Sequence, residues 1–496
     1  MHLFNKMTQR SRKAIVIGAG LAGIATAIRL AVKGYAVDVY EVAARPGGKL
    51  SEIRSGDYRF DAGPSLFTMP QYVDELFRLA GKNPEEYFKY KQLETICKYF
   101  YEDGTRLNAY SDRNKFASEV ENATADSAAS VIDYLDKSEK IYQITDPVFL
   151  QRSLHKVMNY FNLTTLRSLL SFPKIDAFRT MNKANSARFK DSKTIRLFNR
   201  YATYNGSNPY QAPATLNVIP HFEQQFGAYF PEGGMYSIVR SLTDLAIDCG
   251  VTFHFNSYVD EIVLTDKKVS GVRIGTETLR ADVVVSNMDV WYTYRKLLKD
   301  IPAPEKILLQ ERSSSALIFY WAINRTFSEL DIHNIFFTED YEKEFQHIWQ
   351  KKDIYDDPTI YLNISSKIEP SDAPPGCENW FTMINVPSNS GQNWDALIDE
   401  ARRNILLKLT RILKTDIAGL IISEQILDPR KIDSQSFSYQ GSLYGSSSNN
   451  QLAAFLRHAN FSSKIDGLFF AGGSVHPGGG IPLALLSAKI VDGLIK

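Results

Sequence analysis

A glycine-rich turn close to the N-terminus constrains the fold more than any other feature of the chain. The segment Gly18-Ala19-Gly20-Leu21-Ala22-Gly23 lies between an apolar run at 14–17 and a stretch with helical apolar spacing at 21–32. In a G-x-G-x-x-G turn the first glycine permits the tight turn, the second lets a pyrophosphate approach the backbone, and the third lets the helix pack on the strand. Backbone N–H groups and the positive end of the helix dipole then meet the phosphate charge. The segment predicts a Rossmann-like βαβ unit that binds a dinucleotide.

A second apolar strand, at 37–41, supports this interpretation. It ends at Glu41, about 20 residues after the first glycine, where an acidic side chain accepts hydrogen bonds from ribose hydroxyls. Arg45-Pro46-Gly47-Gly48-Lys49 follows, and its glycines and cations suit a second approach of the backbone to phosphate and flavin. The same composition is also typical of a solvated basic turn.

A hydrophobic strand at 467–471, followed by Gly472 and Gly473, indicates which dinucleotide is bound. Gly480-Ile481-Pro482 then opens a helix, whose N-terminus can stabilise the negative charge of a reduced flavin. No second G-x-G-x-x-G lies between a strand and a helix, so a separate NAD(P) domain is not expected. The motifs together predict FAD, and the alternative is a structural loop beneath the strand.

Two segments imitate membrane or export signals. The uncharged stretch 467–488 is long enough to span a bilayer, but its cluster of glycines and prolines breaks a lipid-exposed helix. The basic N-terminus followed by an apolar run resembles a signal peptide, but glycines and Arg29 interrupt it. We expect neither a membrane span nor export.

Composition and charge argue against a nucleic-acid binding protein, a disulfide-stabilised scaffold and a metal site. The chain has 496 residues, which predicts about two to four domains, and its net charge of +1 gives no general electrostatic case for nucleic acid. Cys97, Cys249 and Cys377 lie far apart without ligand spacing, so we expect no disulfide, no metal site and a reducing compartment.

Apolar spacing predicts further elements along the chain. Helices are expected at 74–80 and 394–413 and through most of 112–200, and a hairpin at 99–107. Strands are expected at 251–255, 261–264, 271–274, 281–285, 315–323, 360–364 and 381–386.

Several motifs along nearly the whole chain resemble the carotenoid desaturase family, within the amine-oxidase and GDP-dissociation-inhibitor flavoprotein superfamily. Besides the glycine segments above, they are Asp61-Ala62-Gly63-Pro64-Ser65, Phe230-Pro231-Glu232-Gly233-Gly234-Met235, Ser286-Asn287-Met288-Asp289 and Gly472-Gly473-Ser474-Val475-His476-Pro477-Gly478-Gly479-Gly480-Ile481-Pro482. The resemblance implies FAD as cofactor, bound by Gly18 to Gly23, Glu41, Val42, Arg45, Gly47, Gly48, Lys49, Gly63, Pro64, Ser65, Val259, Asn287, Asp289, Gly472, Gly473, Gly480, Ile481 and Pro482. Lys49 stands where many relatives have arginine, which keeps the charge but not a fork-like contact.

The resemblance also implies an amine-oxidase-like α/β fold with an α+β substrate part. A discontinuous Rossmann-like FAD-binding domain is expected over 1–70, 230–300 and 464–496. A sheet-based substrate domain is expected over 71–110 and 301–463, and a helical membrane-facing lid over 111–229.

One string narrows the expected activity. Arg200-Tyr201-Ala202-Thr203-Tyr204-Asn205-Gly206 resembles the subgroup that desaturates 1-hydroxylated carotenoids at the 3,4 position. Desaturation removes a hydride, which flavin N5 accepts, and a proton from the neighbouring carbon. We expect Asp191, Arg200 and His476 as catalytic candidates and Tyr201, Tyr204 and His221 as substrate contacts. The alternatives are a surface ion pair for Asp191 and Arg200, a structural role for His476, and a packing role for His221.

A basic segment suggests where the protein works. Between Leu150 and Arg200, eleven cations face only Asp176 and Asp191, and apolar residues are interleaved. Such a helical surface suits an anionic membrane interface, and the alternative is a solvated helical cap. We expect a cytoplasmic protein that binds peripherally to the inner face of the membrane, with oxygen or a quinone as electron acceptor and no nucleic-acid partner. The remaining alternatives are a phytoene- or lycopene-type desaturase, a carotenoid isomerase, an amine oxidase and a non-enzymatic prenyl-lipid binding protein.

Overall fold

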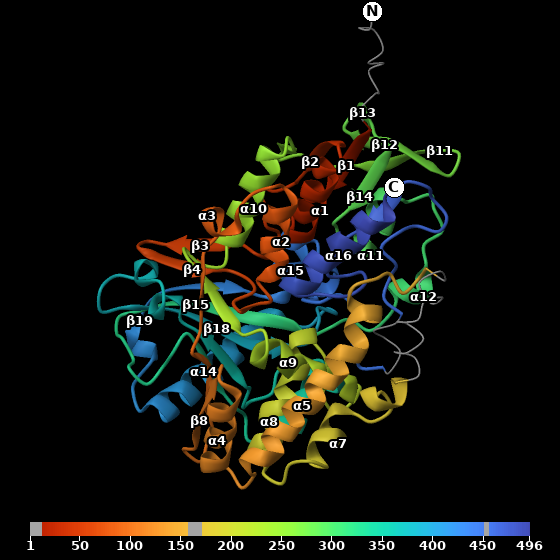
Figure 1. Ribbon diagram of the computed structural model, residues 1–496. Helices are drawn as coiled ribbons and strands as arrows, with labels where there is room; N and C mark the ends of the chain where they lie inside the picture. The colour runs from red at the N-terminus through yellow and green to blue at the C-terminus, as the bar shows by residue number, and fades with distance from the viewer. Residues whose placement is uncertain (1–11, 157–170, 451–455) are drawn as a thin grey trace, which may run out of the picture.

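The N-terminal βαβ unit forms the centre of a five-stranded parallel sheet (Figure 1). Its strand β1 (Lys13–Ile17) pairs with β2 (Ala36–Tyr40) on one side and with β14 (Val283–Ser286) on the other. The outer strands are β10 (Thr252–His254), beside β2, and β20 (Leu468–Phe470), beside β14. Segments from both ends and the middle of the chain therefore share one sheet, and the expected discontinuous Rossmann-like architecture is confirmed. The computed structural model describes residues 12–156, 171–450 and 456–496.

Four helices pack together over this sheet because the first of them is buried on all sides. Helix α1 (Leu21–Val32) is buried from Leu21 to Leu30, as expected for a helix enclosed by other elements. It contacts α2 (Gln71–Leu79), α10 (Ser237–Asp248) and α16 (Ile481–Leu494). The N-termini of α1 and α16, far apart in the sequence, are thereby brought to the same region.

A seven-stranded sheet makes up the second half of the molecule. All its neighbouring strands are antiparallel except β16 and β7, which are parallel. The expected hairpin and three expected strands are confirmed, whereas β16 and β19 were not predicted. The order is β19 (Ile421–Leu427), β15 (Ser315–Ile323), β18 (Glu378–Val386), β17 (Ile360–Asn363), β16 (His333–Phe336), β7 (Thr95–Phe100) and β8 (Arg106–Tyr110).

Helix α14 (Trp394–Leu413) packs its buried apolar residues into the core of the seven-stranded sheet. This matches the amphipathic helix expected at 394–413. Three small antiparallel sheets complete the strands: β3 (Glu52–Ser55) with β4 (Tyr58–Asp61), β5 (Phe67–Thr68) with β9 (Ala228–Pro231) and β6 (Tyr90–Gln92), and β11 (Glu261–Thr265) with β12 (Lys268–Ile274) and β13 (Glu277–Arg280).

A buried charge cluster joins the two halves. The guanidinium of Arg59 on β4 contacts the carboxylates of Glu52, Asp61 and Asp372 at 2.6–3.1 Å. Asp61 also accepts hydrogen bonds from the backbone N–H groups of Met235 and Tyr236, just before α10. Buried charges persist when they are paired in this way, so the cluster fixes how the sheets meet.

The segment from 112 to 224 is helical, as expected, in its described part. It crosses the lower face of the molecule in Figure 1. No helix among the described residues is long and apolar enough to span a bilayer. The helices here are α4 (Arg113–Ala123), α5 (Ala128–Thr145), α7 (Met181–Ser186), α8 (Ser192–Asn199), η4 (Arg200–Asn205) and α9 (Ile219–Gln224). Residues 157–170, which hold most of the interleaved apolar residues of the basic segment, lie outside the described part.

Candidate active site

A cavity of about 750 Å³ lies where the parallel sheet, the seven-stranded sheet and the helical segment meet. One end is formed by glycine-rich loops at the ends of the parallel strands, and the other by strands β15 to β18 together with η4. We call these the glycine end and the sheet end. The glycine end is lined by Gly20, Gly47, Gly48, Gly63, Gly472, Gly473 and Gly480, and the sheet end by Arg200, Thr203, Tyr204, Ile318, His333, Tyr361 and Met383, among others.

The glycines of the N-terminal turn leave no room for side chains. A Cβ at Gly23 would lie 2.2 Å from the carbonyl oxygen of Gly18, and one at Gly20 would lie 2.6 Å from Asn287 Oδ1. Gly18 itself has φ +97°, which disfavours any residue with a side chain. Asn287 is held in place because its Nδ2 donates to the carbonyl oxygen of Ala471 at 2.8 Å. The turn is thus open on its cavity side and closely packed behind.

Glu41 fixes the backbone beside this turn. Its carboxylate accepts hydrogen bonds from the N–H groups of Ala19 and Ala43, at 2.7 and 2.8 Å. The side chain is buried and does not line the cavity. Its neighbour Val42 is exposed, and Val259 is buried beside the same sheet.

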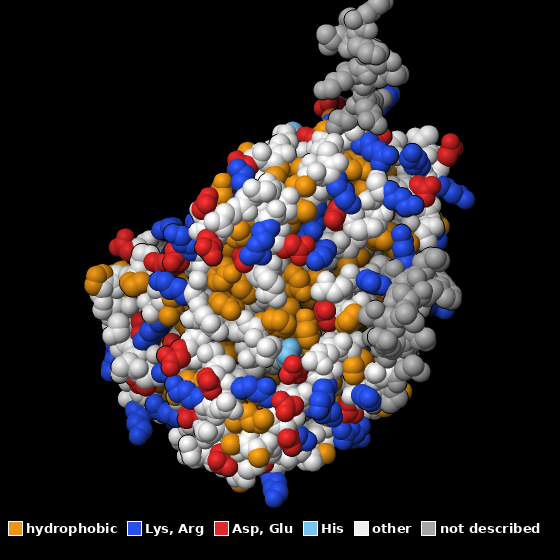
Figure 2. All heavy atoms as spheres, viewed as in Figure 1, with side chains coloured by type: hydrophobic (Ala, Val, Ile, Leu, Met, Phe, Trp, Pro, Cys, Tyr) orange, Lys and Arg blue, Asp and Glu red, His pale blue; other side chains and the backbone are white. Residues whose placement is uncertain are grey.

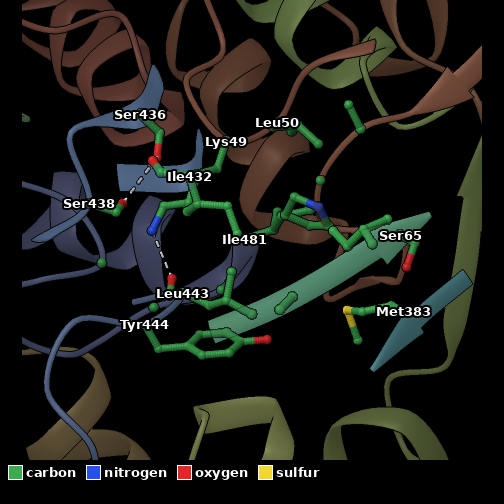
Figure 3. Close-up of a pocket in the computed structure, with 18 of the residues that line it drawn as sticks. Lys49, Leu50, Ser65, Met383, Ile432, Ser436, Ser438, Leu443, Tyr444 and Ile481 are labelled. Atoms are coloured by element: carbon green, nitrogen blue, oxygen red, sulfur yellow. Dashed lines mark hydrogen bonds between the residues drawn. The ribbon is translucent and has the colours of Figure 1, made fainter. Parts of the chain in front are cut away.

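Lys49 connects the glycine end to a loop of the sheet half. Its Nζ donates to the carbonyl oxygen of Leu443 at 2.8 Å, as Figure 3 shows, and lies 3.4 Å from that of Ser442. Burial lowers the pKa of Lys49 to about 8, although the nearby carboxylate of Asp289 opposes the shift. The amine is therefore a cation whose charge an anionic ligand would stabilise.

A buried polar cluster closes the sheet end. The guanidinium of Arg200 donates to the hydroxyls of Tyr99 and Tyr204, at 2.7 and 3.1 Å, and lies 3.8 Å from the carboxylate of Glu223. The hydroxyls of Tyr201 and Tyr204 both donate to Glu223. Arg200 is 6% exposed, so its positive charge is held in the protein interior by one carboxylate and the faces of the tyrosine rings.

A chain of hydrogen bonds runs from the glycine end toward this cluster. Ser65 Oγ lies 2.6 Å from the hydroxyl of Tyr361, and that hydroxyl lies 2.8 Å from Nδ1 of His333. All three residues line the cavity. Burial, with a smaller effect of the Arg200 charge, lowers the pKa of His333 to about 3, so the ring is neutral.

Comparison of the sequence with known proteins now identifies the family. Residues 21–491 match the family described as flavin containing amine oxidoreductase. The chain belongs to the flavin-containing amine oxidoreductases. It is 50% identical to a 1-hydroxycarotenoid 3,4-desaturase of Flavobacterium sp. (strain P99-3), over 98% of this chain and 99% of the relative. It is 33% identical to a 4,4'-diapolycopene oxygenase of Methylomonas sp, over 97% of both chains. The resemblance to the carotenoid desaturases is thereby confirmed.

Solved structures share the fold of this flavin oxidoreductase. Wild-type putrescine oxidase bound to putrescine superposes with a TM-score of 0.64 at 12% identity, covering 97% of this chain and 98% of the other. Cyclohexylamine oxidase from Brevibacterium oxydans IH-35A superposes with a TM-score of 0.62 at 15% identity and 98% coverage of both chains. The amine-oxidase-like fold is therefore confirmed.

The glycine end fits FAD, the cofactor of this flavin oxidoreductase. The N-termini of α1 and α16 both open there, and two helix dipoles with free N–H groups favour a pyrophosphate and a reduced flavin ring. Of the residues expected to bind FAD, the following line the cavity: Gly20, Leu21, Ala22, Arg45, Gly47, Gly48, Lys49, Gly63, Pro64, Ser65, Asn287, Asp289, Gly472, Gly473, Gly480, Ile481 and Pro482. Gly18, Ala19, Gly23, Glu41, Val42 and Val259 lie behind or beside these and do not line it.

The structure separates the expected catalytic and substrate residues. Arg200 and Tyr204 line the cavity, and Tyr201 lies behind them with its hydroxyl on Glu223. Asp191 is outside the cavity, because it is the N-cap of α8 and accepts hydrogen bonds from the N–H groups of Lys193 and Ala125. An aspartate at this position is a common helix cap, which accounts for Asp191 structurally, and its catalytic role stays a prediction.

The two expected histidines also lie outside the cavity lining. His476 is fully buried, and its Nε2 donates to the carbonyl oxygen of Arg152 at 2.9 Å. Burial lowers its pKa to about 3, so the ring is neutral, and its catalytic role stays a prediction. His221 packs against the rings of Tyr142 and Phe226, with centroids 4.9 and 5.4 Å apart. Burial lowers the pKa of His221 as well.

Sequence reasoning missed His333, Tyr361 and Tyr444. Tyr361 was placed on an expected strand, but nothing in the sequence indicated that its hydroxyl reaches Ser65, 296 positions away. His333 lies on the four-residue strand β16, which carries no periodic signal long enough to detect. Tyr444 points into the cavity beside Lys49 in Figure 3 and follows the polar stretch near 440.

Proposed function

We propose that this flavin oxidoreductase is a carotenoid desaturase that introduces a C=C bond at the 3,4 position of a 1-hydroxylated carotenoid. The observation that carries the proposal is the single cavity that joins an FAD-type glycine end to a largely apolar sheet end with one buried polar cluster. The 1-hydroxycarotenoid 3,4-desaturase of Flavobacterium, at 50% identity, supports the same assignment.

Residues of the cavity wall can align the polyene with the flavin and keep water away from the reacting carbons. Ile318, Ile335, Phe381 and Met383 line the sheet end and can hold a polyene by contact alone. When bound, FAD supplies the two-electron acceptor that takes the hydride. An enclosed apolar wall keeps water from the reacting carbons. Arg200 and Tyr204 would contact the oxygen-bearing end of the substrate.

The same cavity disfavours amine oxidation. An amine substrate is a cation at neutral pH and needs an anionic partner when it is buried. The carboxylate of the polar cluster, Glu223, already faces Arg200 and two tyrosine hydroxyls. The polar cluster is better matched to a neutral oxygen atom.

We further propose that the protein binds peripherally to the inner face of the membrane and passes electrons to oxygen or a quinone. The side chain of Phe178 is 74% exposed, and the exposed Lys174 and Lys183 precede and follow it in the sequence. An exposed aromatic ring near exposed cations suits a lipid interface. Figure 2 shows further hydrophobic side chains near the centre of the face that it views, with basic and acidic side chains around them. The residue ranges given above for the FAD-binding domain, the substrate domain and the lid remain part of this proposal.

Anaerobic mixing tests the reaction. FAD-loaded protein is mixed without oxygen with phytoene, with lycopene or with the 1-hydroxylated derivative of lycopene. The proposal predicts flavin bleaching together with a longer-wavelength polyene, and faster for the hydroxylated member. Bleaching with phytoene alone would reassign the protein to phytoene desaturation. Absence of bleaching with every carotenoid would favour a non-redox binding protein, and a product of unchanged mass an isomerase.

A further inference from the structure

Two buried hydrogen-bond donors at the sheet end have no partner among the described residues. They are Nε of Arg200 and Nε2 of His333. His333 is 2% exposed, and both side chains line the cavity. A buried donor without an acceptor destabilises a protein unless a ligand or water satisfies it.

The hydrogen bonds around His333 determine which ring nitrogen carries the proton. The amide of Asn363 is oriented by its Nδ2, which donates to the carbonyl oxygen of Ile332 at 3.1 Å. The same Nδ2 lies 3.1 Å from Nδ1 of His333. A ring nitrogen that faces an N–H group must present its lone pair. In the neutral ring the proton is therefore on Nε2, which is a donor.

The neighbouring polar groups are already engaged. The remaining N–H groups of Arg200 face Tyr99 and Tyr204, and the hydroxyls of Tyr201 and Tyr204 face Glu223. Arg200 donates to the hydroxyl of Tyr99 on β7, and β7 pairs with β16, the strand that carries His333, so both groups lie at the sheet end of the cavity. The donors left over, Nε and Nε2, remain available to an acceptor on a ligand in the cavity.

We propose that Nε2 of His333 and Nε of Arg200 together bind the C1 oxygen of the substrate. Ser65 and Tyr361 hold His333 on the side of the cavity that faces the glycine end. This inference rests on the proposed function. The C1 oxygen is only a few bonds from the 3,4 carbons, so its site must adjoin the point where hydride leaves. The hydrogen bonds from Ser65 to Tyr361 and on to His333, at 2.6 and 2.8 Å, meet this requirement, because Ser65 lies in a loop that lines the glycine end.

Binding to the reduced enzyme tests this site without turnover. The FAD-loaded protein is first reduced with dithionite, so that no desaturation can occur. Quenching of tryptophan fluorescence then measures the affinity for lycopene and for its 1-hydroxylated derivative. We expect the wild type to bind the hydroxylated member about tenfold more tightly, the effect of two good hydrogen bonds.

Three variants assign the preference to His333. His333→Leu should remove most of the preference, because only Nε of Arg200 remains to donate, whereas His333→Gln, which keeps an N–H donor, should retain part of it. Tyr361→Phe, which keeps the imidazole but removes the hydroxyl that links Nδ1 to Ser65, should lower the preference. The matched control is His347→Gln, because His347 is also buried and pairs with Asp353 away from the cavity.

Equal affinities of the wild type for both polyenes, or an unchanged preference in His333→Leu, would overturn the inference. Different results would contradict the oxygen-binding site and the desaturase assignment. A binding preference without flavin reduction in the oxidised enzyme would support this site and contradict the desaturase assignment. Equal binding with normal flavin reduction would contradict this site alone.

Discussion

At the scale of single residues, Gly20 gives the most direct test of the cofactor site. Gly20→Val places a branched side chain where a Cβ already meets Asn287 Oδ1 at 2.6 Å, so pyrophosphate can no longer approach the turn. We expect the purified variant to carry less than about a tenth of the wild-type flavin per chain, the effect of roughly 1.4 kcal/mol or more. Gly493→Ala in α16 is the control, since its Cβ would meet nothing within 4 Å. Full flavin content in Gly20→Val would contradict the site.

Lys49 makes FAD affinity depend on pH. Its pKa is about 8 in the cofactor-free fold, and a bound anion favours the protonated form. The ammonium is present below that pKa and is lost above it, so the dissociation constant of FAD should rise by about tenfold as pH increases through 8, the effect of losing a charge-assisted hydrogen bond. The Lys49→Met variant should bind FAD more weakly than the wild type at low pH, and its dissociation constant should not rise through pH 8. The control is Lys33→Met, on the surface outside the cavity, which should bind FAD as the wild type does. A pH-independent affinity in the wild type would show that Lys49 does not contact the cofactor.

At the scale of elements, the contact between η4 and α9 depends on one buried carboxylate. Glu223→Gln removes the negative charge that faces Arg200 and two tyrosine hydroxyls. Removing one partner of a buried ion pair leaves an uncompensated charge, so we expect the free energy of unfolding to fall by about 3 kcal/mol in denaturant titrations. The exposed pair of Arg295 with Glu305 provides the control, since Glu305→Gln should change stability little. Equal stability of both variants would mean that Glu223 does not balance Arg200.

Elements differed in how well the sequence predicted them. The βαβ unit, the hairpin and α14 were predicted because glycine turns and apolar periodicity leave few alternatives. Strands β16 and β19 were not, because β16 begins with the polar residues His333 and Asn334 and β19 is only partly buried. The same limit applies to the site. Backbone constraints identified the glycine end from local sequence, but the sheet end depends on pairs such as Ser65 and Tyr361 that only the fold brings together.

At the scale of the whole molecule, the basic segment predicts membrane binding. Reversing Lys174, Arg179 and Lys183 to glutamate should reduce flotation with anionic liposomes, mainly through the two lysines, because Arg179 already pairs with Asp176. Phe178→Ser should weaken the part of the binding that resists salt. The control reverses three exposed cations of the β12–β13 hairpin, Lys268, Arg273 and Arg280. Equal flotation of the two triple variants would contradict a specific membrane-facing surface.

The central claim is that one cavity aligns a hydroxylated polyene with FAD for removal of two hydrogen atoms. The most direct measurement is the mass of the product from a single anaerobic turnover of FAD-loaded protein with 1-hydroxylated lycopene. We predict a product two hydrogen atoms lighter than the substrate, formed in proportion to the flavin reduced, with the hydroxyl retained. A product of unchanged mass, or a reaction that requires oxygen and adds an oxygen atom, would contradict the account.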